Sequence, residues 1–195
     1  MREILPPGAE AEYITVEDYL RIEELSEERH EYVAGVLFSM AGGTRRHNRI
    51  ISNLVRQMLD PADATACEVY AGDVKLRVAN DVIYYPDVFV ACDSDERDPL
   101  IMSSACVIVE VQSPSTSVTD RTEKLIAYRA IPSLRAYLII RQDAPLVIRH
   151  WRSAVTDPWN IELHSDGEIP IPCLDMHLPI DAIYRNLPRT DDAEE

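Results

Sequence analysis

The sequence predicts an α/β fold in which a mixed central sheet is flanked by helices. Strand-like apolar segments fill the middle of the chain, and the elements run in the order helix, hairpin, helix, several strands, helix, two strands. The 195 residues suffice for one domain with a sizeable core. We expect that domain over 13–188, between a flexible N-terminus at 1–12 and an acidic, disordered tail at 189–195.

Local signals predict two helices with a hairpin between them. Thr15, ahead of acidic residues, predicts the start of a short helix that runs to about Glu28. Residues 31–41 alternate apolar and polar around an Ala-Gly pair, which predicts the hairpin. Thr44 is expected to cap the second helix, whose apolar residues recur at helical spacing, and Pro61 is expected to end it.

Arginines mark the opposite face of the second helix. They are Arg45, Arg49 and Arg56. Such a stripe is usually a solvated helix face. The alternative is contact with the phosphates of a nucleic acid.

Strand-like segments follow, with one more helix among them. They cover 67–71, 74–78, 82–92, 105–111, 135–141 and 145–151, and 161–165 is a further candidate. The segment 105–111 is almost wholly apolar, which favours a central strand covered on both faces. A helix is expected from about Asp120 to Ala130, and a closing helix over 180–187.

The cysteines and the apolar runs indicate the cellular setting. The four cysteines, none at C-x-x-C spacing, are interpreted as small buried hydrophobic residues in a reducing compartment, not as a disulfide or zinc framework. They are Cys67, Cys92, Cys106 and Cys173. No apolar run has membrane-spanning length and no secretory signal is evident, so we expect a cytoplasmic protein without a membrane partner.

The net charge of −15 limits the ways in which the chain can bind nucleic acid. A strongly negative protein repels phosphate at long range, which counts against simple coating of a nucleic acid. An enzyme that gathers a few positive groups at one cleft remains compatible with this charge.

Two carboxylates in apolar strand segments are the candidate chemical centre. Glu110 lies inside the predicted central strand, where an ionised side chain is costly unless a cation pairs with it. Asp87 lies 23 residues earlier, at the start of another apolar segment, so the two can meet on neighbouring strands. Gln112, two residues after Glu110, points to the same face of its strand.

Pro86-Asp87 followed at this distance by Glu110-x-Gln112 resembles the active-site signature of the PD-(D/E)XK nuclease fold. A longer series resembles the Uma-two family of restriction-type endonucleases, over about residues 15 to 150. Its members are Glu31 to Gly35, Met40-Ala41, His47, Pro86 to Val88, Val109 to Thr116, Asp120, Lys124 and Tyr128. The segment from Val109 to Thr116, with the Asp120, Lys124 and Tyr128 that follow, is the most specific part.

The resemblance implies a restriction-endonuclease-like core with an N-terminal helix and hairpin, and a Mg²⁺-dependent endonuclease that hydrolyses phosphodiester bonds in DNA. Asp87 and Glu110 are then the ligands of Mg²⁺ or Mn²⁺, helped by the Val111 carbonyl. Glu31 matches the acidic residue of the early hairpin and is expected to reach the same site. A homodimer is an expectation from analogy with the fold alone.

Gln112 stands where the wider fold carries lysine, and it cannot supply positive charge. Lys124, on the next helix, could supply the charge from another backbone position. The chain has only two lysines, Lys75 and Lys124, against seventeen arginines. A compact ammonium on a flexible stem suits a water-positioning role better than a planar guanidinium.

Each candidate also has a purely structural reading. Glu110 could form a structural ion pair, Lys124 a surface salt bridge with Asp120, and Glu31 could face solvent. His47 is interpreted first as a capping or surface residue, and Tyr128 as core packing. Two further functions therefore remain open: a catalytically decayed nuclease fold that binds nucleic acid or regulates, and an assembly protein without a nucleic-acid partner.

Overall fold

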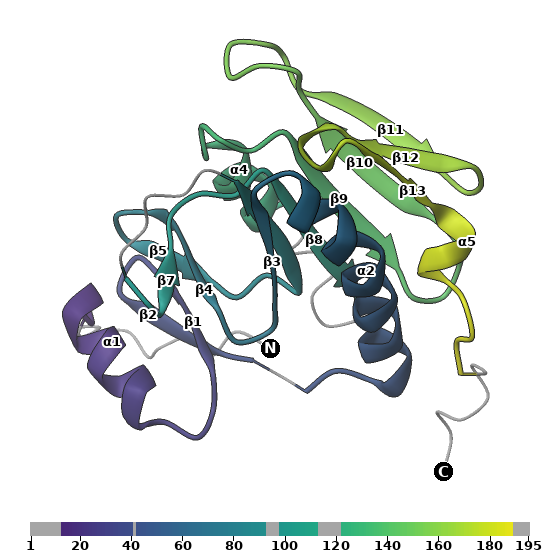
Figure 1. Ribbon diagram of the computed structural model, residues 1–195. Helices are drawn as coiled ribbons and strands as arrows, with labels where there is room; N and C mark the ends of the chain where they lie inside the picture. The colour runs from purple at the N-terminus through teal and green to yellow at the C-terminus, as the bar shows by residue number, and fades with distance from the viewer. Residues whose placement is uncertain (1–12, 41, 93–97, 113–121, 189–195) are drawn as a thin grey trace.

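The computed structural model describes residues 13–40, 42–92, 98–112 and 122–188. Two sheets and four α-helices dominate this part of the chain (Figure 1). Within the same residues, no helix combines the length and apolar character needed to cross a membrane. The expected N-terminal and C-terminal tails, and the proposed capping role of Asp120, lie outside the described residues.

A six-stranded mixed sheet forms the centre of the molecule. Its order is β11-β10-β9-β8-β6-β3, and only the β8–β9 pair is parallel. The bounds are β3 Cys67–Ala71, β6 Val88–Cys92, β8 Val107–Gln112, β9 Ala136–Arg141, β10 Val147–Trp151 and β11 Asn160–His164. All six residues of β8 are buried, as expected for a strand covered on both faces.

A five-stranded sheet carries the N-terminal hairpin. Its order is β2-β1-β5-β4-β7. The bounds are β1 His30–Val33, β2 Val36–Ser39, β4 Lys75–Ala79, β5 Val82–Tyr84 and β7 Ile101–Met102. The predicted hairpin is confirmed, with Ala34 and Gly35 at its turn in the left-handed region at φ of 48° and 86°.

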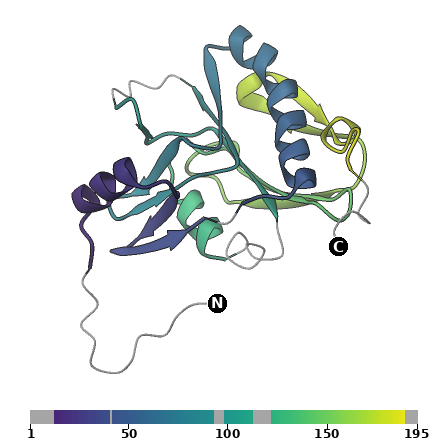
Figure 2. The ribbon, with the colours of Figure 1, turned by 90° about the horizontal axis from the view of Figure 1, so that it is seen from below.

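One face of the six-stranded sheet packs against α2 (Arg45–Ala64) and the C-terminal elements. These elements are β12 Glu168–Ile171, the 3-10 turn η1 Pro172–Leu174, β13 Met176–Pro179 and α5 Ile180–Ile183. Ile50, Leu54 and Met58 of α2 are fully buried in this layer, at the helical spacing that predicted them. Figures 1 and 2 show α2 running along the sheet beside these elements.

The other face packs against α4 (Glu123–Arg129) and the five-stranded sheet. Its core is rich in aromatic rings: Tyr128 makes edge contacts with Tyr84 and Tyr137, at centroid distances of 5.5 and 5.1 Å. At the outer end, α1 (Val16–Leu25) is capped by Thr15, as predicted, and buries Tyr19 against the hairpin. The site described below lies between α4, the hairpin and the central sheet.

Two prolines act differently from the expectation. Pro61 lies inside α2, which continues to Ala64. Proline this close to the end removes only one helical hydrogen bond, and the last turn is held by buried Ala62 and by the Thr65 hydroxyl, which donates to the Pro61 carbonyl at 2.8 Å. Pro86 divides the expected strand 82–92, because a residue without an N–H cannot continue the ladder.

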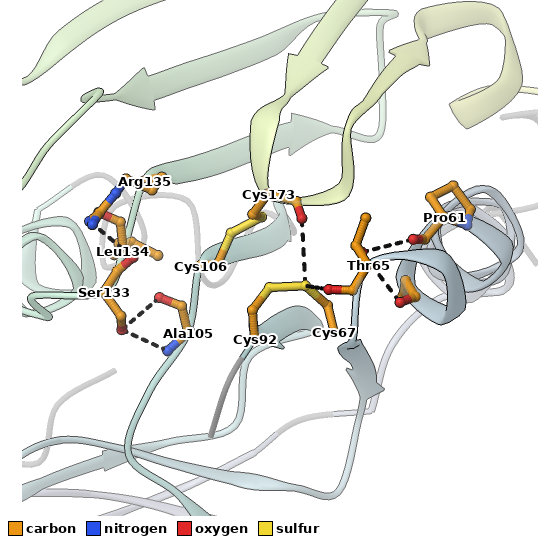
Figure 3. Close-up of a disulfide and its surroundings, with 11 residues drawn as sticks. Pro61, Thr65, Cys67, Cys92, Ala105, Cys106, Ser133, Leu134, Arg135 and Cys173 are labelled. Carbon is orange, nitrogen blue, oxygen red and sulfur yellow. Dashed lines mark hydrogen bonds between the residues drawn. A yellow bond between two sulfur atoms is a disulfide. The ribbon is translucent and has the colours of Figure 1, made fainter. Parts of the chain in front are cut away.

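The cysteine prediction was wrong: the structure contains two disulfides, Cys67–Cys92 and Cys106–Cys173 (Figure 3). Cys67 and Cys92 are paired directly across β3 and β6, with Cα atoms 4.1 Å apart. The second bond joins the start of β8 to η1, across a Cα distance of 6.6 Å. Spacing along the chain gave no sign of either bond, because all four partners meet only through the tertiary fold.

Candidate functional site

The antiparallel pair β6–β8 brings the two candidate carboxylates together. Val88 is paired with Val109, so the preceding Asp87 stands opposite Glu110. Side chains alternate along β8: Val109 and Val111 face α2, whereas Ile108 faces the α4 side. Asp87 and Glu110 therefore start from the same, α4-facing side of the sheet, as the sequence predicted.

Asp87 is fixed by contacts to both of its oxygens. Oδ2 accepts a hydrogen bond from the Val111 backbone N–H at 2.7 Å, which locks the carboxylate to β8. Oδ1 lies 3.1 Å from Nε2 of His47, in the first turn of α2. The carboxylate is thus held between the end of the central strand and the N-terminal end of α2.

Glu110 is buried, with only 4% of the residue exposed. Its Oε1 accepts hydrogen bonds from Lys124 Nζ at 3.0 Å and from the Tyr128 hydroxyl at 2.7 Å. Both donors come from one face of α4, because residues four apart lie one above the other on a helix. A buried carboxylate needs such partners to remain charged, and α4 supplies them.

Lys124 joins the hairpin to this centre. Its Nζ lies 2.7 Å from Glu31 Oε1 on β1 and 5.4 Å from the centre of the Tyr84 ring. The residue is only 5% exposed, so its ammonium is buried and is not at the surface. Glu31 does not face solvent either, since its side chain is 15% exposed.

Burial keeps the phenols of the site protonated. It raises the pKa of Tyr128 well above its usual value, and the charge of Glu110 raises it further. Burial also raises the pKa of Tyr84 to about 12. Tyr128 therefore stays a hydrogen-bond donor to Glu110 across the whole physiological pH range.

A second polar network anchors the end of β8. The Gln142 amide donates to the Gln112 carbonyl oxygen at 2.6 Å, and its nitrogen lies 3.4 Å from Nδ1 of His47. Thr44 donates to Gln142 Oε1 at 2.9 Å. Gln112 itself is 7% exposed, at the end of β8. The network sets the position of His47 relative to Asp87.

The donor set fits a hard divalent cation. Carboxylate and carbonyl oxygens are the ligands that such cations prefer, and Asp87 and Glu110 provide two carboxylates on facing strands. The Glu31 Oε1 atom is buried, and the Lys124 ammonium is its ion-pair partner at 2.7 Å. Glu31, Asp87 and Glu110 do not bring three ligand oxygens close together. Among the described residues, the group of three close ligand atoms consists of cysteine sulfurs and lies elsewhere.

The arginine stripe lies on the solvent side of α2. All three side chains, Arg45, Arg49 and Arg56, are exposed. Arg45 and Arg49 flank His47 in the chain, so the stripe begins next to the site and leads away from it. Arg46, between them, is committed to structure, because it donates to the backbone carbonyls of Gln142 and Pro188.

The structure joins Glu110 and Glu31 through Lys124 and sets Asp87 opposite Glu110 on the neighbouring strand. Gln112 lies two residues after Glu110, at the end of β8. Sequence reasoning included His47 in the family series but gave it a capping or surface role, whereas its side chain contacts Asp87. It missed Gln142 and gave Tyr128 a packing role only. The i,i+4 relation of Lys124 and Tyr128 was a signal that could have found the second donor. Nothing local marks Gln142, which reaches the site from the turn after β9.

Comparisons with known proteins identify the family and the fold of this chain. The model of the Uma2 family, described as "Putative restriction endonuclease", matches residues 16–175. Two uncharacterized Synechocystis proteins are similar: slr1290 is 30% identical over 93% of this chain and 96% of its own length, and sll1609 is 31% identical over 69% and 78%. A crystal structure from Anabaena variabilis, described as "a putative nuclease belonging to DUF820", shares the fold with a TM-score of 0.71. It is 18% identical and covers 88% of this chain and 97% of that one.

Proposed function

The chain belongs to the Uma2 family, and we propose that it is a cytoplasmic, metal-dependent endonuclease that hydrolyses phosphodiester bonds in DNA. The observation that carries this proposal is the buried Lys124 ammonium, held between Glu110 and Glu31. Asp87 stands opposite Glu110 on the neighbouring strand. An ammonium beside paired strand carboxylates is the charge arrangement that phosphodiester hydrolysis needs.

In this proposal Asp87 and Glu110 hold Mg²⁺ or Mn²⁺, with the Val111 carbonyl as a further oxygen donor. Such a cation would lower the pKa of a bound water and offset the negative charge of the phosphate. The Val111 N–H and His47 keep Asp87 in place, and Tyr128 keeps Glu110 in place. Glu31 takes part by holding Lys124 at the site.

Lys124 fills the role that Gln112 cannot. Its ammonium reaches the carboxylates from α4, whereas the wider fold supplies a lysine from the position of Gln112. The positive charge would stabilise the phosphate as negative charge builds up on it in the transition state. The Gln112 side chain, on the same strand face as Glu110, would orient the nucleophilic water or a phosphate oxygen by hydrogen bonding.

DNA would approach along α2. Arg45, Arg49 and Arg56 are exposed on one side of this helix, and its first turn contacts Asp87 through His47. A chain of charge −15 needs a local cationic path of this kind to bring phosphate near the site. Cleavage of both strands would need two sites, which a homodimer would supply.

The competing function is a decayed nuclease fold that binds nucleic acid without cutting it. Gln112 and the net charge favour it. The position of Lys124 weighs against it, because its ammonium lies 3.0 Å from Glu110 Oε1 and would supply the positive charge that Gln112 lacks. A decayed protein would bind DNA equally well with or without Lys124 and would cut it in neither case.

Titration calorimetry with Mn²⁺ and Mg²⁺ tests the metal site without knowledge of the target sequence. We expect the parent chain to bind Mn²⁺ and Glu110→Gln to lose this binding. Glu162→Gln is the matched control, because Glu162 pairs with Arg149 away from the site. If the parent and Glu110→Gln bind Mn²⁺ with equal affinity, Glu110 is not a metal ligand.

A further inference from the structure

Four cysteines from four separate elements meet on the α2 side of the six-stranded sheet. Cys67 begins β3, Cys92 ends β6, Cys106 directly precedes β8 and Cys173 lies in η1. The sulfurs of Cys92, Cys106 and Cys173 lie within 4.8 Å of one another, so the group spans both disulfides (Figure 3). Two disulfides that served only as cross-links would not need to touch.

We propose that these four sulfurs, once both disulfides are reduced, bind one soft divalent cation of the zinc class. In a tetrahedral site with Zn–S bonds of about 2.3 Å, neighbouring sulfurs lie roughly 3.8 Å apart. The three sulfurs of the group lie within 4.8 Å of one another, so reduction has only to let the bonded sulfurs of each disulfide move apart to this spacing. Thiolates select zinc-class cations over Mg²⁺ and Mn²⁺, so this site is chemically distinct from the carboxylates of Asp87 and Glu110.

The scaffold holds the four sulfurs in place and leaves a way in. Cys67 and Cys92 are register partners across two paired strands, and Cys106 is fixed by backbone hydrogen bonds to Val90, Arg135 and Ala136. Cys67 and Cys106 are each 6% exposed, whereas Cys92 and Cys173 are only partly buried. A reductant and a cation can therefore reach the partly buried pair first.

The Cys67 sulfur lies at the side of the group that faces η1 and the end of α2. Cys67 Sγ is 3.5 Å from the carbonyl oxygens of Thr65 and Cys173 (Figure 3). The Cys173 backbone therefore lies close to the Cys67–Cys92 pair as well as to Cys106.

The disulfide-bonded state and the cation-bound state of the four cysteines cannot coexist. Each disulfide takes two electrons and two protons from a dithiol reductant, which is itself oxidised to a disulfide, and four thiols result. Binding of the cation displaces the four thiol protons. Removal of four electrons by an oxidant re-forms both disulfides and releases the cation. The occupant of this site therefore depends on the thiol–disulfide balance of its surroundings.

The test uses the full chain in excess Mg²⁺, with and without prior reduction by a dithiol that is then removed. Zn²⁺ is titrated in, and bound zinc is measured by native mass spectrometry and by competition with a chromophoric chelator. We expect about one zinc per reduced chain and none per oxidised chain. Cobalt in place of zinc should give the charge-transfer absorption of thiolate coordination.

Loss of a residue that only contacts a metal ligand already weakens metal binding by at least about tenfold. Cys106→Ser and Cys173→Ser, which each remove a ligand, should therefore weaken zinc binding by more than this. His177→Gln is the control for surface binding, because His177 is exposed on β13. The proposal is overturned if the reduced chain keeps its circular dichroism and takes up no zinc, or if it unfolds and zinc does not restore it. Equal zinc uptake by the serine variants overturns it as well.

Discussion

Lys124 is one of only two lysines in the chain, and its ammonium is buried between two carboxylates. Lys124→Met should lower DNA cleavage by about 10²- to 10³-fold, because a positioned charge at the phosphate is lost. Mn²⁺ binding should persist or tighten, since the substitution removes a positive charge beside Glu110. Cleavage assays and calorimetry on the same preparations measure both effects.

Lys75→Met is the matched control for that substitution. Lys75 lies on β4, and its ammonium stands over the ring of Tyr85, 5.5 Å from the ring centre. The substitution should leave cleavage and metal binding unchanged. If Lys124→Met cuts DNA as fast as the parent, the lysine does not replace the missing one at position 112.

The substitution of Tyr128 by phenylalanine tests whether α4 also positions Glu110. Tyr128→Phe removes a hydrogen bond to a buried carboxylate, and such a bond contributes about 1.5–3 kcal/mol to the free energy of unfolding. We expect a loss of this order in urea unfolding, together with altered Mn²⁺ affinity. Tyr184→Phe removes a hydroxyl that bonds the Arg141 carbonyl, so it should cost stability without changing Mn²⁺ affinity. Unchanged Mn²⁺ affinity in Tyr128→Phe would leave Tyr128 with a structural role alone.

At the scale of elements, α2 carries the proposed path for DNA. Replacing Arg45, Arg49 and Arg56 together by glutamine should weaken DNA binding and flatten its salt dependence. The slope of log K against log salt falls by about 0.9 for each phosphate that the protein no longer neutralises. Binding isotherms at several salt concentrations measure this slope, and Arg21→Gln on α1 is the control. An unchanged slope would mean that the stripe is only a solvated helix face.

The sequence predicted elements best where the pattern is local. The Thr15 and Thr44 caps and the hairpin turn are present as expected. The apolar strand predicted over 105–111 is present at 107–112. It failed where tertiary packing decides, as at Pro61, which stays helical because Ala62 is buried in the core. The prediction that the cysteines form no disulfides failed for the same reason, since Cys106 and Cys173 are 67 residues apart in the sequence.

The candidate site follows the same division. Asp87 and Glu110 could be found because charged residues in apolar strands stand out from their neighbours. Gln142 could not, and the resemblance gave His47 without a role, because each is an ordinary polar residue until the fold places it beside Asp87 or the end of β8. The resemblance supplied Lys124 and Glu31, and the structure supplies their contact.

At the scale of the whole molecule, a separate layer packs on each face of the six-stranded sheet, and each layer contributes to the site. The α2 layer contributes His47, the α4 layer Lys124 and Tyr128, and the hairpin Glu31. These groups belong to different elements, which pack on different faces of the sheet. The geometry of the site therefore depends on the packing of both cores. Conditions that loosen either core should therefore disturb the site before they abolish the fold.

Acid is such a condition, and His150 on β10 gives the expected pH range. Burial, and then the neighbouring Arg129, lower the pKa of His150 from 6.5 to about 4. Between these values the unfolded chain binds a proton on His150 and the folded chain does not. The free energy of unfolding should therefore fall as the pH drops from about 6.5 to about 4, by about 3 kcal/mol at most from this residue.

Urea unfolding at a series of pH values measures that fall. His150→Gln keeps an acceptor for the Arg129 guanidinium, which lies 2.9 Å from Nδ1 of the histidine, but it cannot titrate. The variant should show a flatter profile between pH about 6.5 and about 4. His177→Gln, which replaces an exposed histidine, should keep the parental slope. A parental slope in His150→Gln would assign the acid sensitivity to groups other than His150.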